Sequence, residues 1–255
     1  MNWYPGHIEK AKRRIRELLK MVNTVLEVRD ARAPFATSAY GMDFSKKGTI
    51  VVLNKVDIAD KKITKEWVEY FKKQGKRVIT TYKDEPRQVF LRKLHLGRLA
   101  RVLVVGVPNT GKSTIINKLK GKRASSVGAQ PGVTRGIQWF SLENGVKMLD
   151  TPGILYKNIF SKDLAAKLLL VGSLPVERID DHEVFEKAFE IFKRYQGVED
   201  DFTTFFENFA KRRGLLKKGG VPDLDRAIRV FFTEISQGKV GRLSFERPDE
   251  VNPEE

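Results

Sequence analysis

The sequence predicts an α/β fold with a doubly wound, mostly parallel sheet, followed by an all-helical C-terminal domain. Residues 49–53 (TIVVL) and 101–105 (RVLVV) are short apolar runs, typical of parallel strands covered on both faces. Segments with helical spacing alternate with such runs, which indicates crossover helices between the strands. Beyond about residue 161, apolar residues recur only at helical spacing. We therefore expect a sheet domain over 1–160 and a helical domain over 161–255.

The first domain divides into elements by the period of its apolar residues. The N-terminal stretch 8–21 has helical spacing and a basic opposite face, which predicts an amphipathic helix. Asn144-Gly145 separates two strand-like runs and predicts a two-stranded hairpin. The expected strands are 24–29, 49–53, 77–81, 101–105, 137–142 and 146–149, and the other expected helices are 64–74, 86–97 and 112–120.

In the second domain the apolar residues follow a helical period up to about residue 240. The phenylalanines within 202–209 are spaced as core residues, so we interpret them as helix packing and not as platforms for stacking bases. The proline- and acid-containing tail, 244–255, is expected to be loose.

The composition narrows the class of protein. Lys and Arg number 48 against 32 Asp and Glu, and the net charge of +16 points to a polyanionic partner, nucleic acid before an anionic membrane. The absence of cysteine excludes disulfides, thiolate zinc sites and cysteine nucleophiles. No apolar run approaches the roughly 20 residues that span a bilayer, and the N-terminus lacks the apolar core of a signal peptide. We therefore expect a cytoplasmic protein without a membrane partner.

The strongest motif is residues 106–113, GVPNTGKS, which lies between a predicted buried strand and a predicted helix. This is the phosphate-loop pattern, in which glycines turn backbone N–H groups toward phosphates at a helix N-terminus. Lys112 is expected to reach the β- and γ-phosphates, and Ser113 is expected to bind Mg²⁺. The expected nucleotide contacts in this segment are Pro108, Asn109, Thr110, Gly111, Lys112, Ser113 and Thr114.

Two further segments suit the γ-phosphate end of a nucleotide. Asp150 directly follows the predicted strand at 146–149 and can hold Mg²⁺ through water, and Gly153 can donate its N–H to a γ-phosphate. The hydroxyl of Thr134 can complete the metal shell when a triphosphate is present. The loop around Thr134 would then be a switch, ordered by triphosphate and released by hydrolysis.

A separate motif, Asn54-Lys55-Val56-Asp57, follows the strand at 49–53. The Asp57 carboxylate can accept both hydrogen bonds from the N1–H and N2–H₂ edge of guanine, an edge that adenine lacks. Asn54 can fix the loop, and the stem of Lys55 can pack on the base. Thr80 and Thr81, at the end of the next strand, can close the base pocket.

Together these motifs resemble the G1–G4 motifs of the Ras-like P-loop GTPases. Residues 54–57 precede 106–113, so the order is G4-G5-G1-G2-G3, which resembles the circularly permuted members of that group. Residues 3–7 (WYPGH) and 30–34 (DARAP) resemble the YlqF/RbgA branch. That resemblance implies a GTPase that binds GTP and GDP and acts with rRNA in the assembly of the large ribosomal subunit.

The position after Gly153 is Ile154, where Ras-like enzymes usually place the Gln that orients water. The resemblance points to His7 as the replacement, so His7, Lys112 and Thr134 are the expected catalytic residues; alternatively, His7 is an exposed histidine after a Pro-Gly turn. In related GTPases, an Asn at the position of Asn109 accompanies a K⁺ ion, and the alternative is that Asn109 only fixes the loop.

Basic residues cluster in the first helix and in 86–101 and 208–220, the last two without an acid. Such clusters bind phosphates by displacing counterions, which fits a large rRNA surface. We expect a monomer that binds a large-subunit precursor. Two alternatives are a nucleotide-sensing RNA-binding protein with negligible hydrolysis and a membrane-surface or trafficking GTPase.

Overall fold

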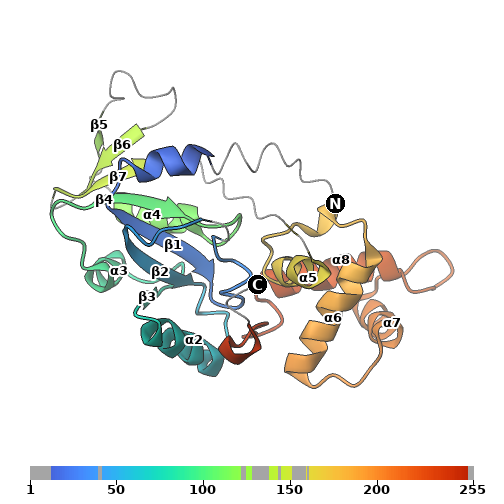
Figure 1. Cartoon of the computed structure of the whole chain (residues 1–255). Helices are drawn as coiled ribbons and strands as arrows, with labels where there is room; N and C mark the ends of the chain where they lie inside the picture. Colours follow the sequence, from blue (N-terminus) through green and yellow to red (C-terminus); the bar gives the residue numbers. More distant parts are fainter. Residues whose placement is uncertain are drawn as a thin grey trace.

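The computed structural model describes residues 13–39, 42–121, 125–127, 138–142, 145–150, 159 and 161–251, with the side chains of 125–127, 138 and 150 left out of the description. Seven strands form one mixed sheet in the order β3-β2-β1-β4-β7-β6-β5 (Figure 1). The strands are β1 (Thr24–Asp30), β2 (Gly48–Asn54), β3 (Arg77–Thr80), β4 (Arg101–Val105), β5 (Ser125–Val127), β6 (Gln138–Ser141) and β7 (Lys147–Asp150).

Strands β3, β2, β1, β4 and β7 are parallel to their neighbours, and β6 and β5 continue the sheet in antiparallel pairing. The pairing of β6 with β7 confirms the expected hairpin strands, although residues 143–144 lie outside the described chain. Strand β5 was not predicted from the sequence, because three residues are too short to show a period.

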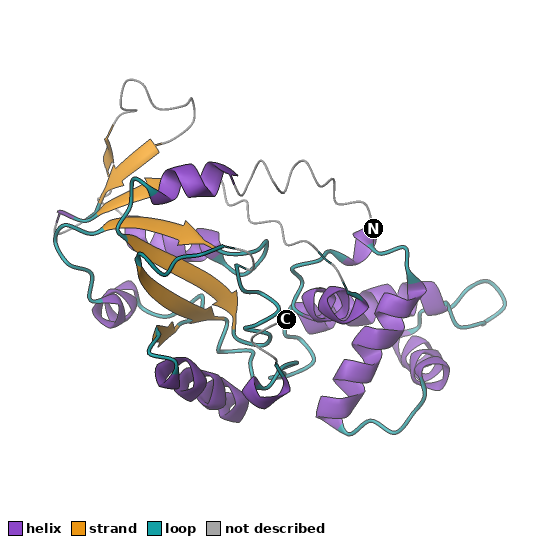
Figure 2. Cartoon of the chain, in the orientation of Figure 1, coloured by secondary structure: helices purple, strands orange, loops and turns teal. Residues whose placement is uncertain are grey.

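Helices cover both faces of the sheet (Figure 2). They are α2 (Lys61–Lys73), α3 (Arg87–Leu94) and α4 (Lys112–Lys120), together with a helix described over 13–19. Phe90 of α3 and Ile115 of α4 pack with Leu26 and Val104 on one face. On the other face the 13–19 helix and α2 cover separate patches, around Val25 and around Trp67. Helix α3 ends at Leu94, short of the predicted 97, because the next residue has a left-handed backbone.

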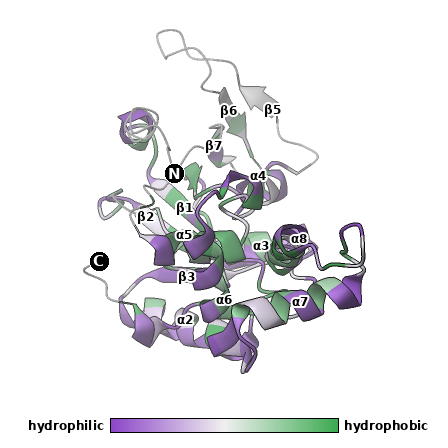
Figure 3. Ribbon diagram, turned by 90° about the vertical axis from the view of Figure 1, so that its right-hand side faces the viewer, coloured by the Kyte–Doolittle hydropathy of each residue, from purple (hydrophilic) through white to green (hydrophobic). Residues whose placement is uncertain are grey.

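The region after residue 161 contains α5 (Lys162–Leu170), α6 (His182–Gln196), α7 (Phe202–Arg213) and α8 (Leu224–Ser236), with short 3₁₀ turns η2 (Val176–Arg178) and η3 (Pro248–Glu250). Each α-helix begins with a Ser or Asp side chain that accepts a backbone N–H of the first turn. Figure 3 shows hydrophobic and hydrophilic stretches alternating along these helices, as expected for amphipathic segments.

The core of this helical region is aromatic. Phe206 is fully buried, and its ring centroid lies 5.3 Å from that of Phe231 and 4.7 Å from that of Phe202. Phe205 and Phe209 also contact Phe231. These rings pack the helices against one another, which confirms their interpretation as core residues. Over the described part of the chain, no helix is both long and apolar enough to cross a bilayer.

The prediction of a loose tail is wrong for the residues that follow α8. Ser244, Phe245 and Glu246 are each 1% exposed. The indole Nε1 of Trp67 in α2 donates to the carbonyl of Glu246 at 3.0 Å, and the carboxylate of Glu246 accepts the backbone N–H of Phe35 at 2.8 Å. The tail therefore packs against the sheet-bearing part of the chain, where its acid finds buried N–H donors that the sequence pattern does not reveal.

Candidate nucleotide-binding site

The predicted site segments meet at one edge of the sheet. Strands β1, β2, β3, β4 and β7 run parallel, so their carboxyl ends share that edge. The chain leaves β1 toward β2 and β3, then returns to the other side of β1 as β4. Ligands of doubly wound sheets bind at such a reversal of strand order. The crevice between β1 and β4 is therefore the expected place for a nucleotide.

The loop between β4 and α4, residues 106–111, requires glycine at both of its motif positions. A Cβ on Gly106 would lie 2.4 Å from the carbonyl oxygen of Val28, and one on Gly111 would lie 2.0 Å from Nδ2 of Asn54. Gly111 also has φ +94°, in the region that favours glycine. The glycines therefore let the loop approach β1 and the loop after β2 directly.

Lys112 begins α4 and is almost fully buried. Its Nζ donates to the carbonyl of Val107 at 2.8 Å, and the hydroxyl of Thr110 donates to the same oxygen at 3.0 Å. Burial lowers the pKa of Lys112 from its usual 10.5 to about 8. An anion near this ammonium would reverse that shift, which is the electrostatic preference that a phosphate site needs.

The loop after β2, residues 55–60, lies against the loop after β4. The amide Nδ2 of Asn54 donates to the carbonyl of Thr110 at 2.9 Å, joining two motifs that are 56 residues apart. The Oδ1 atom of Asn54 is buried without a partner among the described residues. Lys55 has φ +63°, and its Nζ lies 2.8 Å from Oδ2 of Asp30 at the end of β1. Asp57 is exposed and available to a ligand.

Thr80 and Thr81 lie beside that loop, at the end of β3. The carbonyl of Thr81 accepts the N–H of Val56 at 3.3 Å. The Thr81 side chain is buried and its hydroxyl donates to Glu85 at 2.7 Å, so only its backbone faces the loop after β2. Lys118 of α4 donates to the carbonyl of Tyr82 at 2.5 Å and links this segment to the phosphate-loop helix.

The expected metal and catalytic residues fall in two groups. Ser113 is exposed on the first turn of α4, and Thr114 is partly buried beside it. Asn109 donates through Nδ2 to the carbonyl of Gly172, just after α5, at 2.7 Å. Asp150 is the last residue of β7, next to β4, and its side chain lies outside the description. The remaining predicted residues, His7, Thr134 and Gly153, lie outside the described residues.

Comparison with known proteins agrees with this geometry. A family described as 50S ribosome-binding GTPase matches residues 101–196. The ribosome biogenesis GTPase A of Thermotoga maritima is 77% identical over 253 residues, which cover 99% of this chain and 97% of that protein. The chain belongs to the ribosome biogenesis GTPase A (YlqF/RbgA) family.

The likeness to this family extends over nearly the whole chain. The ribosome biogenesis GTPase A of Priestia megaterium is 33% identical, covering 98% of both proteins. A GDP-bound structure of TM YlqF has 73% identity and a TM-score of 0.87, covering 93% of this chain and all of that one. A GNP-bound structure of YlqF from T. maritima has the same identity and a TM-score of 0.86, covering 95% of this chain and all of that one.

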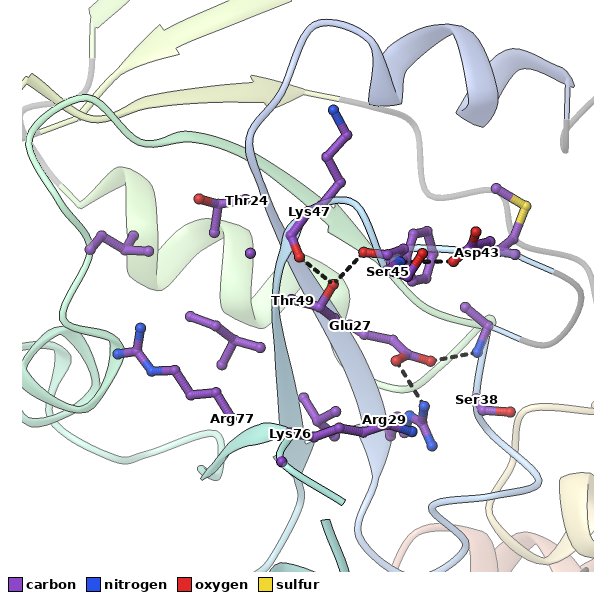
Figure 4. Close-up of a pocket in the computed structure, with 18 of the residues that line it drawn as sticks. Thr24, Glu27, Arg29, Ser38, Asp43, Ser45, Lys47, Thr49, Lys76 and Arg77 are labelled. Atoms are coloured by element: carbon purple, nitrogen blue, oxygen red, sulfur yellow. Dashed lines mark hydrogen bonds and ion pairs between the residues drawn. The ribbon is translucent and has the colours of Figure 1, made fainter. Parts of the chain in front are cut away.

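This member of the ribosome biogenesis GTPase A family also has a cavity of about 840 Å³ away from the phosphate loop (Figure 4). Its lining includes the residues that begin β1, β2 and β3, and therefore lies toward the opposite edge of the sheet. Glu27 and Arg29 lie in it as a buried ion pair at 2.8 Å, and Glu27 also accepts the N–H of Ala39. Arg29 also donates through Nη1 to the carbonyl of Pro34 at 3.2 Å, so most of the pair's polar atoms bind within the fold, although Nε of Arg29 is buried without a partner among the described residues.

Sequence reasoning missed the buried residues that hold the site residues in place through side-chain contacts. Arg32 is fully buried and binds both carboxylate oxygens of Asp30 at 2.9 Å. Glu85 accepts the Thr81 hydroxyl and forms an ion pair with Lys93. One signal was available: Asp30 directly follows a predicted strand, as Asn54 and Asp150 do, which places all three at the same edge of a parallel sheet.

Proposed function

We propose that this member of the ribosome biogenesis GTPase A family binds and hydrolyses GTP and acts in assembly of the large ribosomal subunit. The observation that carries the nucleotide assignment is the hydrogen bond from Asn54 to the carbonyl of Thr110. It joins the end of β2, directly before the loop that carries Asp57, to the phosphate loop, directly before Lys112. One nucleotide can then meet a carboxylate suited to guanine and an ammonium suited to phosphates.

The phosphates would bind the backbone N–H groups of 108–114 and the ammonium of Lys112, with the α4 N-terminus favouring their negative charge. The base would lie between the loop after β2 and the segment at Thr80 and Thr81. Asp57 would accept the two guanine donors, while Asn54 holds the two loops together.

The residues present also fit a magnesium ion. Mg²⁺ is commonly held by a phosphate-loop hydroxyl, waters and the substrate phosphates, and Ser113 presents an exposed hydroxyl at that position. The ion, when bound, would neutralise charge on the phosphates; Asp150 and Thr134 are its other proposed partners, and Asn109 is the proposed partner of K⁺.

The order of the motifs supports a circularly permuted GTPase domain over 1–160, because residues 54–57 precede 106–113 along the chain. The helices of 161–251 support a separate helical domain over 161–255, into which the chain passes after the segment around Gly153. A change at that segment on hydrolysis would then reach α5 directly, which gives the nucleotide a route to the helices.

For hydrolysis we propose that His7 orients or deprotonates water, since Ile154 can do neither. The variant His7→Ala is expected to keep GDP affinity and to lose the hydrolysis that ribosomal particles stimulate. Single-turnover rates with particles present measure this. Equal rates in the two proteins would contradict the role of His7.

The proposed partner is rRNA in a precursor of the large subunit, bound by a cytoplasmic monomer. Exposed cations around the end of α7 support it, namely Lys211, Arg212, Lys217 and Lys218; two of them also lie near acids, Lys211 at 4.0 Å from Glu207 and Lys217 at 3.9 Å from Asp223. Not every cation of the predicted basic clusters is free to bind rRNA phosphates, because in 86–101 Lys93 forms an ion pair with Glu85.

Two experiments test the proposal. Calorimetry with GDP and ADP should show binding of GDP only. Co-sedimentation with ribosomal particles should be strongest with a non-hydrolysable GTP analogue, weaker with GDP or no nucleotide, and weaker at higher salt. Particle binding without GTP turnover would favour a nucleotide-sensing RNA-binding protein, and binding to liposomes would favour a membrane-surface GTPase.

A further inference from the structure

Arg32 lies at the junction between the sheet and the helical region, with no exposed surface. Its Nε and Nη2 atoms bind the two oxygens of Asp30, each at 2.9 Å. Its other donors reach the carbonyls of Val171 at 3.0 Å, Ile235 at 3.1 Å and Ser236 at 3.0 Å. One guanidinium therefore joins the end of β1 to the ends of α5 and α8.

Negative charge surrounds the Arg32 cation on both sides of this junction. Helix C-termini carry partial negative charge, so the ends of α5 and α8 both stabilise the cation. Burial would raise the pKa of Asp30, but Arg32 and Lys55 lower it well below its usual range. The same carboxylate that Arg32 fixes is the one that holds the ammonium of Lys55 at 2.8 Å. The contacts thus run from the helix ends through Arg32 and Asp30 to the guanine-recognition motif.

A second set of contacts fastens the same loop from the C-terminal side. The N–H of Leu243 donates to the carbonyl of Ile58 at 3.1 Å, and the N–H of Asp60 donates to the hydroxyl of Ser244 at 3.2 Å. The N–H of Phe245 donates to the carbonyl of Arg32 itself at 2.7 Å. We call residues 243–246 the strap, because they cross the loop after β2 and bind it at both Ile58 and Asp60.

We propose that Arg32 is a positioning residue for guanine recognition, which acts through Asp30 and Lys55 and is assisted by the strap. Asp57 lies two residues after Lys55 and next to Ile58, so the contacts that hold these two residues set where its carboxylate meets the base. Lys55 has a left-handed backbone, a conformation that persists only where surrounding contacts hold it. The inference rests on the proposed function, because it assigns the loop after β2 to the base.

The positioning has a consequence for the helical region. We call residues 55–60, the loop after β2, the base loop. If the ends of α5 and α8 set the position of the base loop, a partner that shifts these helices changes guanine affinity. By linkage, the nucleotide then changes the affinity for that partner by the same factor. The phosphate loop contacts the residue next to Val171 through a bond of its own, from Asn109 to the carbonyl of Gly172.

The test compares GDP with IDP, which lacks the exocyclic amino group that Asp57 would accept. The ratio of their dissociation constants isolates base recognition, because the phosphate contacts are the same in both. In Arg32→Lys the charge remains but the fork that binds Asp30 is lost. We expect calorimetry to show a preference for GDP over IDP that falls about tenfold, the equivalent of one charge-assisted hydrogen bond.

A matched control is Arg229→Lys, since Arg229 also donates to a helical-region carbonyl, that of Val176 at 2.8 Å. Its hydrogen bond and its ring contact with Phe185 both lie within the helical region, so the GDP preference of this variant should equal that of the wild type. Ser244→Ala removes the strap hydroxyl at little cost in volume and should lower the preference about threefold, the low end for one hydrogen bond. If Arg32→Lys does not fold, Ser244→Ala still tests whether contacts far from the ligand position the base loop, and an unchanged preference in that variant would overturn the positioning.

An unchanged preference in the folded Arg32 and Ser244 variants, with a clear preference in the wild type, would overturn the positioning role and leave the proposed function standing. No preference in the wild type would remove both. An equal fall in Arg229→Lys would show a general effect of the helical region and would also overturn the assignment to Arg32.

Discussion

The two loops that form the candidate site are held in different ways. The phosphate loop, 106–111, has bonds close in sequence, since Thr110 and Lys112 both donate to the carbonyl of Val107, and two bonds to distant residues, Asn54 and Gly172. The base loop, 55–60, is fixed by residues from far along the chain, with Asp30 on one side and the strap on the other. The first loop is therefore held partly by neighbours in the sequence, and the second is held by the tertiary fold.

This difference determines which substitutions can weaken phosphate binding and which can weaken base recognition. A loop held by its own atoms is changed by substitutions within it. A loop held from a distance is also changed by substitutions far from the ligand, such as those in the strap. Four substitutions or conditions separate these cases, and their expected effects decrease in the order given.

Gly111→Ala should have the largest effect, because it damages both loops at once. The new Cβ would lie 2.0 Å from Nδ2 of Asn54, which forms the bond between the loops, and φ is +94°. We expect GDP affinity to fall more than about a hundredfold, which corresponds to roughly 3 kcal/mol. Calorimetry measures the affinity, and thermal unfolding measures the accompanying loss of stability.

The control is Gly197→Ala at the end of α6, where φ is +63° but a Cβ would meet nothing within 4 Å. It should lose stability by about 1 kcal/mol and keep GDP affinity. Wild-type affinity in Gly111→Ala would show that the two loops do not depend on their close approach.

Asp57→Asn tests the base loop alone. The amide presents a donor where guanine also presents one, so GDP affinity should fall about a hundredfold, while XDP, which presents a carbonyl there, should bind better than GDP. Competition calorimetry gives both values. Asp84→Asn, another exposed acid near this edge, is the control and should change neither. Tight GDP binding by Asp57→Asn would place the base elsewhere.

The pH dependence tests the phosphate loop alone. In the free protein the pKa of Lys112 is about 8, and bound phosphates raise it because they favour the charged form. Binding therefore takes up a proton above that pH, so GDP affinity should be flat below about pH 7 and fall by up to about tenfold per unit above pH 8. Calorimetry in buffers of different ionisation enthalpy detects the proton.

The matched control is Lys112→Met. This variant should bind GDP weakly, and its GDP affinity should not fall above pH 8. In the absence of nucleotide the sign reverses: the folded pKa lies below the unfolded one, so the free energy of unfolding should rise with pH between about 8 and 10.5. A pH-independent affinity with no proton uptake would contradict the shifted ammonium.

Asn109→Ala should have the smallest effect, since it removes one exposed contact between the phosphate loop and the carbonyl of Gly172. We expect a loss of unfolding free energy of about 0.5–1 kcal/mol by denaturant titration. The control is Asn117→Ala, which lies on α4 after the phosphate loop. A large loss of stability would mean that the contact between the loop and α5 carries more of the fold than one hydrogen bond.

Much of the sheet was predictable because every strand except β5 shows a period or an apolar run of its own. Residues 101–105 were predicted with the bounds that β4 has, and the phosphate loop follows directly, because its glycines are needed within a few residues of one another. Strand β5 and the burial of Ser244 and Glu246 were not predictable, because short or polar segments gain their partners only from distant parts of the chain.

The sequence by itself determined the strands, the aromatic helices, the phosphate loop and the residue types suited to guanine, since all of these depend on neighbours within about a dozen positions. Only the tertiary structure decided that Asn54 binds Thr110, that Arg32 is buried between Asp30 and two helix ends, and that the strap returns across the base loop. The physical reason is that a buried charge or N–H must find a partner, and a sequence does not show which distant group the fold brings to it.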